Sequence, residues 1–495
     1  MKYITLLLFV IVFNGSAQNT NVFLDRAFWK ANPSIDLIDK EIAKGNNILE
    51  FNQSTFNGLS YAILDGVDNE TIKHIFKKEK VDVNMLTHDA RTYIFWAASR
   101  NNVELMEFLI KNGAKLDIKD SNANTVLNYA ALNGQTNPKL YDLLISNGVD
   151  IKEEKTLYGA NALLLVAPYV KDFKEIEYFI SKGIDINTTD TNGNGIFNYV
   201  ARSGNTKMLN TLIKKGVSYK KPNKEGGNAM FFASQGLRRK ANSLEFFKYL
   251  ESLGIKPNTI TDKGESPLHT LAFRSNDKEV FNYFINKGVD VNQANNEGNT
   301  AFMNAVRRNN LEIVSFLSTY LKDINNTNNK GVSSLALAIR YNTPEIVEFI
   351  INKEASIEGN DAKGNNIGYY LINSYSSARK ESFESKLKLL QSKNFDFNTP
   401  QESGSTLLHI ALDKNNLDLL KYLQAFKIDV NTINDEGVTI LHKAVMTAKD
   451  DKIIKYLIAI GADKNIKTSF EESVFDLASE NELLQKNNID ISFLK

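Results

Sequence analysis

Residues 262–292 read DKGESPLHTLAFRSNDKEVFNYFINKGVDVN, and close variants of this segment recur along the whole chain. Residues 402–431 read ESGSTLLHIALDKNNLDLLKYLQAFKIDVN, and residues 434–465 read NDEGVTILHKAVMTAKDDKIIKYLIAIGADKN. Glycines close successive units at nearly constant intervals, at Gly113, Gly148, Gly183, Gly216, Gly254 and Gly288. A regular period of this kind predicts stacked supersecondary units rather than a single globular core.

Each unit contains two short runs with apolar residues at helical spacing, as in Val280, Phe281, Phe284 and Ile285. Helices this short are not stable alone, and one unit cannot bury both of its faces. Stacking of the units is therefore predicted to bury one apolar residue of each first helix. Seven such positions are Leu127, Phe197, Leu268, Phe302, Leu335, Leu408 and Leu441.

The turn between the paired helices is predicted to need a residue in the left-handed conformation, which glycine and asparagine tolerate best. Two units have glycine there, and four have asparagine. These residues are Gly134, Gly204, Asn101, Asn309, Asn342 and Asn415.

The recurring segment resembles the ankyrin repeat, whose signature is a polar turn, then T-P-L-H-x-A, then a second helix that ends in G-A-D-x-N. Residues 266–272 (SPLHTLA) are the best match, and Thr406–His409 and Thr439–His442 follow closely. The resemblance extends over roughly residues 20–485 and implies an all-α repeat solenoid of helix-turn-helix units with short β-turn fingers. About 12 to 13 repeats would fill this length. Extra residues near 235–243 and 373–382 predict longer helices or exposed loops in two units.

The first residues have the features of a secretory signal. A charged start, Met1-Lys2, precedes the apolar run Ile4–Phe13, and Gly15-Ser16-Ala17 supplies the small residues that a signal peptidase requires. Ten apolar residues are about half of what spans a bilayer, so an uncleaved anchor fits less well. We expect a signal peptide at 1–17, a capping repeat at 18–52, a repeat array at 53–467 and a second capping repeat at 468–495.

Composition narrows the classes of partner. The chain has 59 basic and 58 acidic residues, so loss of Lys2 with the signal peptide leaves a neutral chain, and bulk attraction to nucleic acid is not expected. Cysteine is absent, which excludes disulfides, thiol catalysis and cysteine metal sites. No membrane insertion is expected after cleavage of the signal peptide. Polar capping units at both ends predict a monomer.

No motif for catalysis is apparent. Three of the five histidines, His269, His409 and His442, occupy the T-P-L-H position, where a hydrogen-bonded structural role is expected. Residues 190–195 (DTNGNG) match the start of a calcium loop, but Ala201 stands where the bidentate glutamate belongs, so we interpret them as a polar turn. We therefore expect no catalytic residues, no cofactor and no metal, and do not expect an enzyme.

The concave surface offers a candidate binding site. In ankyrin folds the two residues after the first helix contribute to this surface, and six of the eleven arginines of this chain fall at those positions. Arginine binds carboxylates and stacks on aromatic rings, and both residue types are enriched at binding hot spots. We therefore expect an arginine–aromatic groove on this surface that holds an acidic partner. The candidate partner-binding residues are Arg100, Tyr169, Arg202, Phe273, Arg274, Arg307, Arg308, Arg340 and Tyr341. Arginine here is also a structural habit of ankyrin repeats, in which it caps the helix and pairs with a neighbouring acid.

The functional expectation is a non-enzymatic protein that holds an acidic protein partner on a rigid concave surface in the bacterial cell envelope, in the periplasm or secreted. The alternative is an immunity-type or protective factor that inhibits or shields a specific toxin or enzyme. Sequence does not separate a scaffold from an inhibitor.

Overall fold

The computed structural model describes residues 21–238 and 240–495, so the expected signal peptide lies outside the described residues. Contacts between residues divide the chain into two compact units, with the boundary between Lys221 and Pro222. Within the described residues every regular element is a helix, and β-pairing is limited to isolated bridges such as Ala294–Thr300 and Thr327–Ser333. Each unit is therefore an all-α repeat solenoid, as the sequence predicted.

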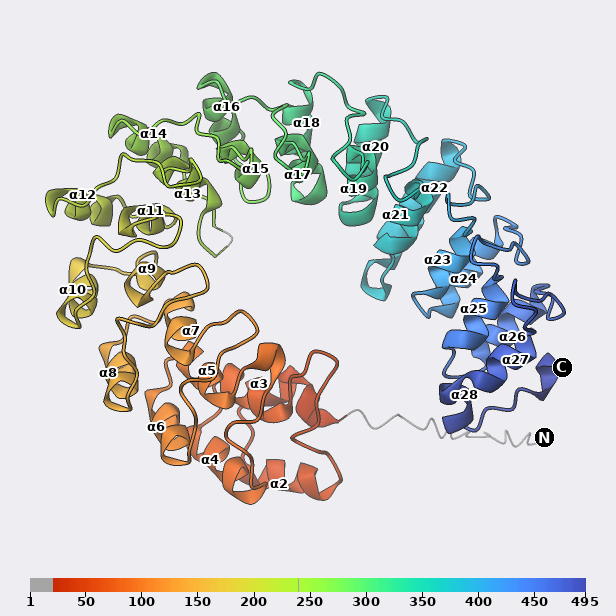
Figure 1. Ribbon diagram of the computed structural model, residues 1–495, viewed down its shortest axis with the longest axis horizontal. Coiled ribbons are helices and arrows are strands. Elements are labelled where there is room, and N and C mark those ends of the chain that lie inside the picture. Colours follow the sequence, from red (N-terminus) through yellow and green to blue (C-terminus); the bar gives the residue numbers. More distant parts are fainter. Residues whose placement is uncertain (1–20, 239) are drawn as a thin grey trace, which may run out of the picture. The chain divides into compact units, whose positions relative to one another are not determined.

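The N-terminal unit contains twelve α-helices among its described residues (Figure 1). They are α1 (Arg26–Lys30), α2 (Ile35–Ala43), α3 (Gly58–Asp65), α4 (Asn69–Lys78), α5 (Tyr93–Ser99), α6 (Val103–Lys111), α7 (Val126–Leu132), α8 (Pro138–Ser146), α9 (Ala162–Val166), α10 (Phe173–Ser181), α11 (Ile196–Ala201) and α12 (Thr206–Lys214). Two 3₁₀ turns, η1 (Val22–Leu24) and η2 (His88–Ala90), accompany them.

The C-terminal unit contains sixteen α-helices among its described residues. They are α13 (Ala229–Gln235), α14 (Leu244–Ser252), α15 (Pro267–Leu271), α16 (Lys278–Asn286), α17 (Ala301–Arg308), α18 (Leu311–Ser318), α19 (Ser334–Tyr341), α20 (Pro344–Asn352), α21 (Ile367–Ser374), α22 (Lys380–Ser392), α23 (Leu407–Leu412), α24 (Leu417–Gln424), α25 (Ile440–Thr447), α26 (Lys452–Ala459), α27 (Val474–Glu480) and α28 (Glu482–Lys486). The 3₁₀ turns are η3 (Ser377–Arg379) and η4 (Ser492–Leu494).

Each layer is a pair of helices, and like helices of neighbouring layers pack together. In the C-terminal unit α15 contacts α17 and α17 contacts α19, while α16 contacts α18 and α18 contacts α20. Figure 1 shows α15, α17 and α19 on one side of this row and α16, α18 and α20 on the other. The seven apolar positions predicted to be buried are all at most 2% exposed. The layers thus share cores between neighbours, which is the reason that a single unit would not be stable.

The first helices begin with capping side chains. In α15, α23 and α25 the N-cap Ser or Thr and the histidine three residues later form a reciprocal capping box. Nδ1 of His269 accepts a hydrogen bond from the backbone N–H of Ser266 at 3.1 Å, and its Nε2 lies 3.1 Å from the carbonyl of Asn299 in the next layer. His442 bridges in the same way to the carbonyl of Ile466 at 2.9 Å. The predicted structural role is confirmed as a helix cap for all three histidines, and as a bridge to the next layer for His269 and His442.

Polar fingers between the layers are joined by a ladder of backbone hydrogen bonds. The N–H groups of Asn296, Asn329 and Ala362 donate to carbonyls of the preceding finger, at 2.8, 3.0 and 2.8 Å. The three donors are separated by equal steps along the sequence, each one repeat long. Each finger is therefore held in the same register relative to the one before it.

The prediction for the turn residues is right at four positions and wrong at two. Gly134, Gly204, Asn101 and Asn415 have positive φ. The asparagines Asn309 and Asn342 do not: Asn309 is extended, with φ −92° and ψ 176°, and Asn342 is similar.

The reason is a contact between layers. The side-chain amide of Asn309 donates to the carbonyls of Ala272 and Ser275, at 2.9 and 2.8 Å, and the amide of Asn342 donates to Val306 and Asn309. An extended backbone directs each amide at the open carbonyls at the end of the preceding first helix. These asparagines tie layers together instead of turning the chain.

The two insertions take the two forms expected. Near 235–243 the chain forms a loop with a bridge between Leu237 and Lys240, and the second insertion lengthens α22 to 13 residues. Across the described residues, none of the helices combines the length and apolar character that crossing a bilayer would demand.

Candidate functional site

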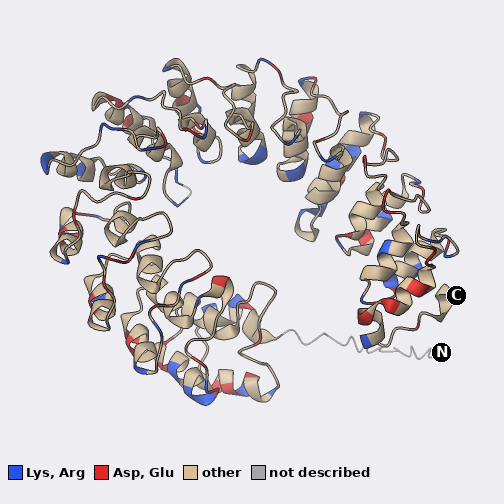
Figure 2. Ribbon diagram, in the orientation of Figure 1, with Lys and Arg blue, Asp and Glu red and all other residues tan. Residues whose placement is uncertain are grey.

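Three first helices of the C-terminal unit carry arginine at their C-terminal ends. Arg274 follows α15, Arg307 and Arg308 end α17, and Arg340 lies in the last turn of α19. Arg274, Arg307 and Arg340 follow one another at equal intervals of one repeat, so they occupy equivalent positions in successive layers. Figure 2 shows basic residues at these ends of α17 and α19. A cation at a helix C-terminus is also favoured by the helix dipole, by about 0.3–1 kcal/mol.

Arg307 and Arg308 face opposite neighbouring layers. Consecutive residues on a helix are rotated by about 100°, so the side chains of Arg307 and Arg308 leave α17 in different directions. Arg308 lies toward α15, where it lines a cleft with Phe273 and Arg274. Arg307 lies toward α19, where its guanidinium is 4.6 Å from the centre of the Tyr341 ring.

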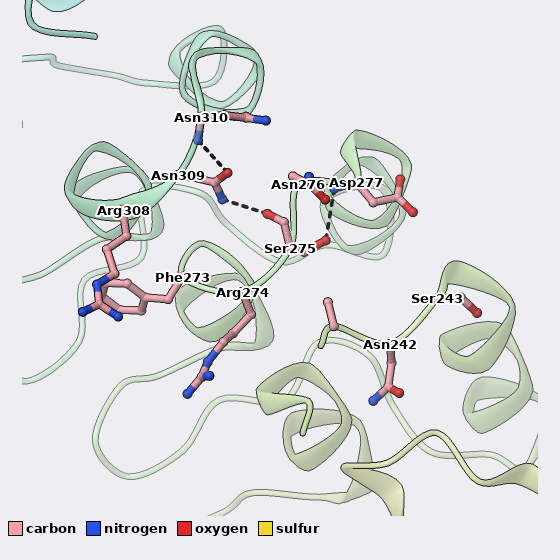
Figure 3. Close-up of a pocket in the computed structure, with 11 residues that line it drawn as sticks. Asn242, Ser243, Phe273, Arg274, Ser275, Asn276, Asp277, Arg308, Asn309 and Asn310 are labelled. Carbon is pink, nitrogen blue, oxygen red and sulfur yellow. Dashed lines mark hydrogen bonds between the residues drawn. The ribbon is translucent and has the colours of Figure 1, made fainter. Parts of the chain in front are cut away.

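We call the boundary between α15 and α17 the first seam, formed by Phe273, Arg274 and Arg308. Its three residues line part of an open cleft of about 570 Å³, which extends to Asn242 and Ser243 before α14. In Figure 3 the side chains of Arg274 and Arg308 extend in the same direction, and the ring of Phe273 lies beside Arg308. The rim is fixed by Asn309, whose amide donates to the carbonyl of Ser275 at 2.8 Å.

The boundary between α17 and α19 is the second seam, formed by Arg307, Arg340 and Tyr341. Both guanidinium groups lie over the Tyr341 ring, at 4.6 Å for Arg307 and 5.2 Å for Arg340. Tyr341 is 39% exposed, so it remains accessible while its ring orders both arginines. Each seam therefore contains two arginines and one aromatic ring.

The four seam arginines have no carboxylate partner in the described part of the chain, where ion pairs are common on other residues. The structural alternative combined helix capping with pairing to a neighbour's acid. Arg307, Arg308 and Arg340 do lie in the last turns of their helices, where capping is expected, but no ion pair is formed by them among the described residues. Arg274, Arg307 and Arg308 are exposed, and Arg340 is half-buried. Asp277 also lines the cleft, and it forms no ion pair with any residue that the structure describes. The seams present concentrated positive charge on a chain of formal net charge +1.

The other three candidate residues belong to the N-terminal unit. Arg100 is exposed and caps the C-terminus of α5, and Arg202 is half-buried and caps α11. The hydroxyl of Tyr169, which follows α9, donates to the carbonyl of Leu132 at 3.1 Å. These residues stand in three different layers, and Tyr169 joins its layer to the preceding one.

Sequence reasoning missed a buried arginine in a finger of the N-terminal unit. Arg91 is 8% exposed, forms an ion pair with Asp120 at 2.9 Å and a second with Asp89 at 3.1 Å. Its guanidinium lies 4.3 Å from the Tyr129 ring and 5.3 Å from the Trp96 ring. The available signal was an arginine just before the N-cap threonine, where four other fingers have asparagine. Aromatic residues follow it about one turn later, at Trp96, and about one repeat later, at Tyr129.

Comparisons with known proteins agree with the repeat architecture. A family model of ankyrin repeats in three copies matches residues 59–155, 239–328, 268–361 and 374–468. A second, of ankyrin repeats in many copies, matches residues 164–213. Together they match well over half of the chain.

Similar proteins are diverse. A Caenorhabditis elegans homologue of transient receptor potential cation channel subfamily A member 1 is 27% identical over 220 residues, which are 44% of this chain and 15% of that protein. The phosphocholine transferase AnkX of Legionella pneumophila is 25% identical over 207 residues, 41% of this chain and 20% of that protein. This chain therefore spans a fifth or less of either relative.

Two shorter proteins are covered almost completely. The putative ankyrin repeat protein FPV223 of fowlpox virus is 27% identical over 137 residues, 28% of this chain and 93% of that protein. Among solved structures, the ankyrin repeat domain of Bcl-3 aligns with a TM-score of 0.36 at 21% identity, over 45% of this chain and 98% of that one.

Proposed function

The chain belongs to the ankyrin-repeat family, and on that premise we propose that it is a non-enzymatic protein that binds an acidic protein partner through its two arginine seams. Ankyrin repeats are a protein-interaction module. The observation that carries the proposal is the charge of the seams: four arginines in three consecutive layers, without carboxylate partners of their own in the described chain. An acidic partner would supply the missing carboxylates.

The seams are well suited to binding because little has to be ordered on association. Stacking on Tyr341 holds the guanidinium groups of Arg307 and Arg340, and hydrogen bonds from Asn309 fix the rim of the first seam. Immobilising a long side chain on binding costs about 0.5–1.5 kcal/mol, so prior ordering by the ring lowers that cost. Arginine and tyrosine are also the residues that most often dominate binding energies.

We propose no chemistry for this surface. The buried histidines of the C-terminal unit are engaged as helix caps, and burial lowers the pKa of His269 below its ordinary value. A neutral, hydrogen-bonded imidazole inside a capping box stabilises the repeat and is not available to a substrate.

We place the partner in the bacterial cell envelope, because residues 1–17 have the features of a cleavable export signal. The test is to express the full chain in a Gram-negative host and determine the N-terminus of the purified protein by mass spectrometry. Export with cleavage gives a protein that begins at Gln18 and is recovered in the periplasmic fraction. A protein that retains Met1 in the cytoplasm would overturn this placement.

The binding proposal is tested by affinity capture from an envelope extract with residues 18–495. The matched bait has Arg274, Arg307, Arg308 and Arg340 replaced by glutamate, and a second control has the exposed finger residue Lys330 replaced by glutamate. We expect a protein that the unchanged bait and the Lys330→Glu bait hold and the fourfold variant does not. Equal capture by all three baits would mean that the seams do not bind.

The captured protein is then titrated against the chain at increasing salt concentration. Because the seam arginines are exposed, their attraction for an acidic surface is screened, and affinity should fall as salt rises. Measuring the activity of the captured protein with and without the chain separates a holding role from an inhibitory one. Light scattering of the free protein tests the expected monomer.

A further inference from the structure

The two seams have the same composition and are one layer apart, which fixes the spacing of what they can hold. Each contains two arginines and one aromatic ring. The fingers of the same layers are joined at intervals of one repeat by backbone hydrogen bonds, so the layers repeat regularly. Packed helices lie about 8–10 Å apart, and the seams therefore repeat with about that period.

Only some backbone conformations present acidic side chains on one face at that period. In a β-strand, alternate side chains lie on one face and recur about every 6.7 Å, which is too short. In a polyproline II helix every third side chain lies on the same face, and three residues advance about 9.3 Å, which matches. An α-helix offers positions seven apart at about 10.5 Å, but with a body about 10–12 Å wide.

The aromatic rings decide between the two conformations that match. Phe273 in the first seam and Tyr341 in the second lie beside the arginines, and Tyr341 is 39% exposed. Grooves lined by aromatic rings are the usual binding sites for polyproline II segments, whose proline rings pack against them. An α-helical ligand would instead require an apolar groove for its own apolar face.

We propose that the seams bind an acidic segment of the partner in polyproline II conformation, with a carboxylate at every third residue and proline between. One carboxylate lies between Arg274 and Arg308, and the next lies between Arg307 and Arg340. Proline rings between them pack on Phe273 and Tyr341. This inference rests on the proposed function, because it specifies which acidic partner segment the seams accept.

The test uses the full chain and four fluorescein-labelled probes in fluorescence polarisation. The first is (Asp-Pro-Pro)₄, and the second has the same composition with its four aspartates in one block. The third is an alanine-based helical peptide with glutamate at every seventh residue, and the fourth is the oligonucleotide (dT)₁₂. We expect (Asp-Pro-Pro)₄ to bind at least tenfold more tightly than each of the others. Equal or tighter binding of the block peptide, the helical peptide or the oligonucleotide would overturn the proposal.

Paired variants test whether both seams are used. R274Q/R308Q removes the first seam, R307Q/R340Q removes the second, and Lys330→Gln is the control for loss of an exposed charge. Each paired variant should weaken (Asp-Pro-Pro)₄ binding at least tenfold, and the control less than twofold. An effect of only one pair, or none, would contradict a ligand that spans both seams. Glutamine keeps these surface positions polar, and circular dichroism before titration confirms that each variant is folded.

The same variants separate this inference from the proposed function. If a captured partner loses binding to both paired variants but does not compete with (Asp-Pro-Pro)₄, the seams bind protein and the polyproline II assignment is wrong. If the partner binds both variants as well as the unchanged chain, the proposed function itself fails.

Discussion

Replacement of the buried Arg91 by methionine should destabilise the N-terminal unit more than any exposed arginine substitution. Arg91 is 8% exposed, and its guanidinium donates to Asp120, whose side chain is fully buried. Methionine preserves apolar volume beside the rings of Trp96 and Tyr129 but leaves the Asp120 carboxylate without its cation. Removing one member of a buried ion pair typically costs about 3–5 kcal/mol.

Local contacts place the expected cost toward the lower end of that range. One oxygen of Asp120 accepts hydrogen bonds from the backbone N–H groups of Asn122 and Asn124, both at 2.9 Å, and these remain in the variant. Methionine keeps an apolar contact with the Tyr129 ring, so loss of the cation–π contact of Arg91, at 4.3 Å, adds only about 0.5–1 kcal/mol. We expect a free-energy loss of about 3–4 kcal/mol.

Hydrogen exchange of the full chain measures this loss where it occurs, because repeat proteins open locally. A loss of about 3–4 kcal/mol lowers the protection of amides in α5 and α7 on the order of a hundred- to a thousandfold. Amides in α23 and α25 of the C-terminal unit serve as the internal reference. The matched control is Arg100→Met, the same change at an exposed position, which should alter stability by about 0.5 kcal/mol or less.

A double-mutant cycle with Asp120→Asn isolates the pair itself. Residues in direct contact show coupling energies of about 0.5–3 kcal/mol. If Arg91→Met leaves the protection of α5 and α7 within the range of the Arg100→Met control, the ion pair is not what holds these two fingers together. A coupling energy near zero would refute the same reasoning even if both single variants were unstable.

Three further predictions concern stability. Burial lowers the pKa of His409 to about 4. Between pH 6.5 and 4 the unfolded chain therefore binds a proton at this histidine while the folded chain keeps it neutral, so stability is lost as the pH falls across that window. His409→Gln keeps a capping-box side chain and should remove about 3 kcal/mol of this pH dependence in urea unfolding; an unchanged profile would exclude the histidine as its source. Burial also lowers the pKa of Lys386 to about 8, so as the pH rises the folded state loses that proton before the unfolded state does, and stability rises between pH 8 and 10.5. Lys386→Met should reduce that rise by about 3 kcal/mol. An equal rise in both proteins would contradict the assignment. Gly298 has φ +79°, and an added Cβ would lie 2.5 Å from the backbone nitrogen of the next finger, whereas a Cβ on Gly288 (φ +86°) would meet nothing within 4 Å. Gly288→Ala should therefore lower the free energy of unfolding only by the conformational strain, about 1 kcal/mol, measured by thermal unfolding. Gly298→Ala should lower it by at least about 1 kcal/mol more. Equal losses in the two variants would mean that the contact between the fingers is not tight.

Several features followed from the sequence because they depend on neighbours along the chain. The regular repeat period determined the layers, and apolar residues at helical spacing determined which positions are buried, such as Leu268 and Leu441. The T-P-L-H pattern located the capping boxes, including the histidine bridge of His269 to the next layer. Local propensity and a repeated core contact are sufficient for these features, because each unit meets only its neighbours.

The tertiary structure alone decided which polar side chains meet. Asn309 and Asn342 share the sequence position of Asn101 and Asn415, yet their side chains reach carbonyls of the layer before and their backbones are extended. Arg91 is paired with a carboxylate one repeat away, at Asp120, and the seam arginines are not. Such contacts join residues that lie roughly one repeat apart, and spacing along the chain does not specify them.

The different directions of Arg307 and Arg308 are the clearest example of a feature that only the tertiary structure decided. Sequence placed Arg307 and Arg308 at one helix end and predicted a single groove. The rotation of about 100° between consecutive helical residues sends Arg308 to the cleft with Arg274 and Arg307 to the ring of Tyr341. The sequence by itself determined that arginines gather at these helix ends, and the packing of three layers decided that they form two seams, each with two arginines and one aromatic ring.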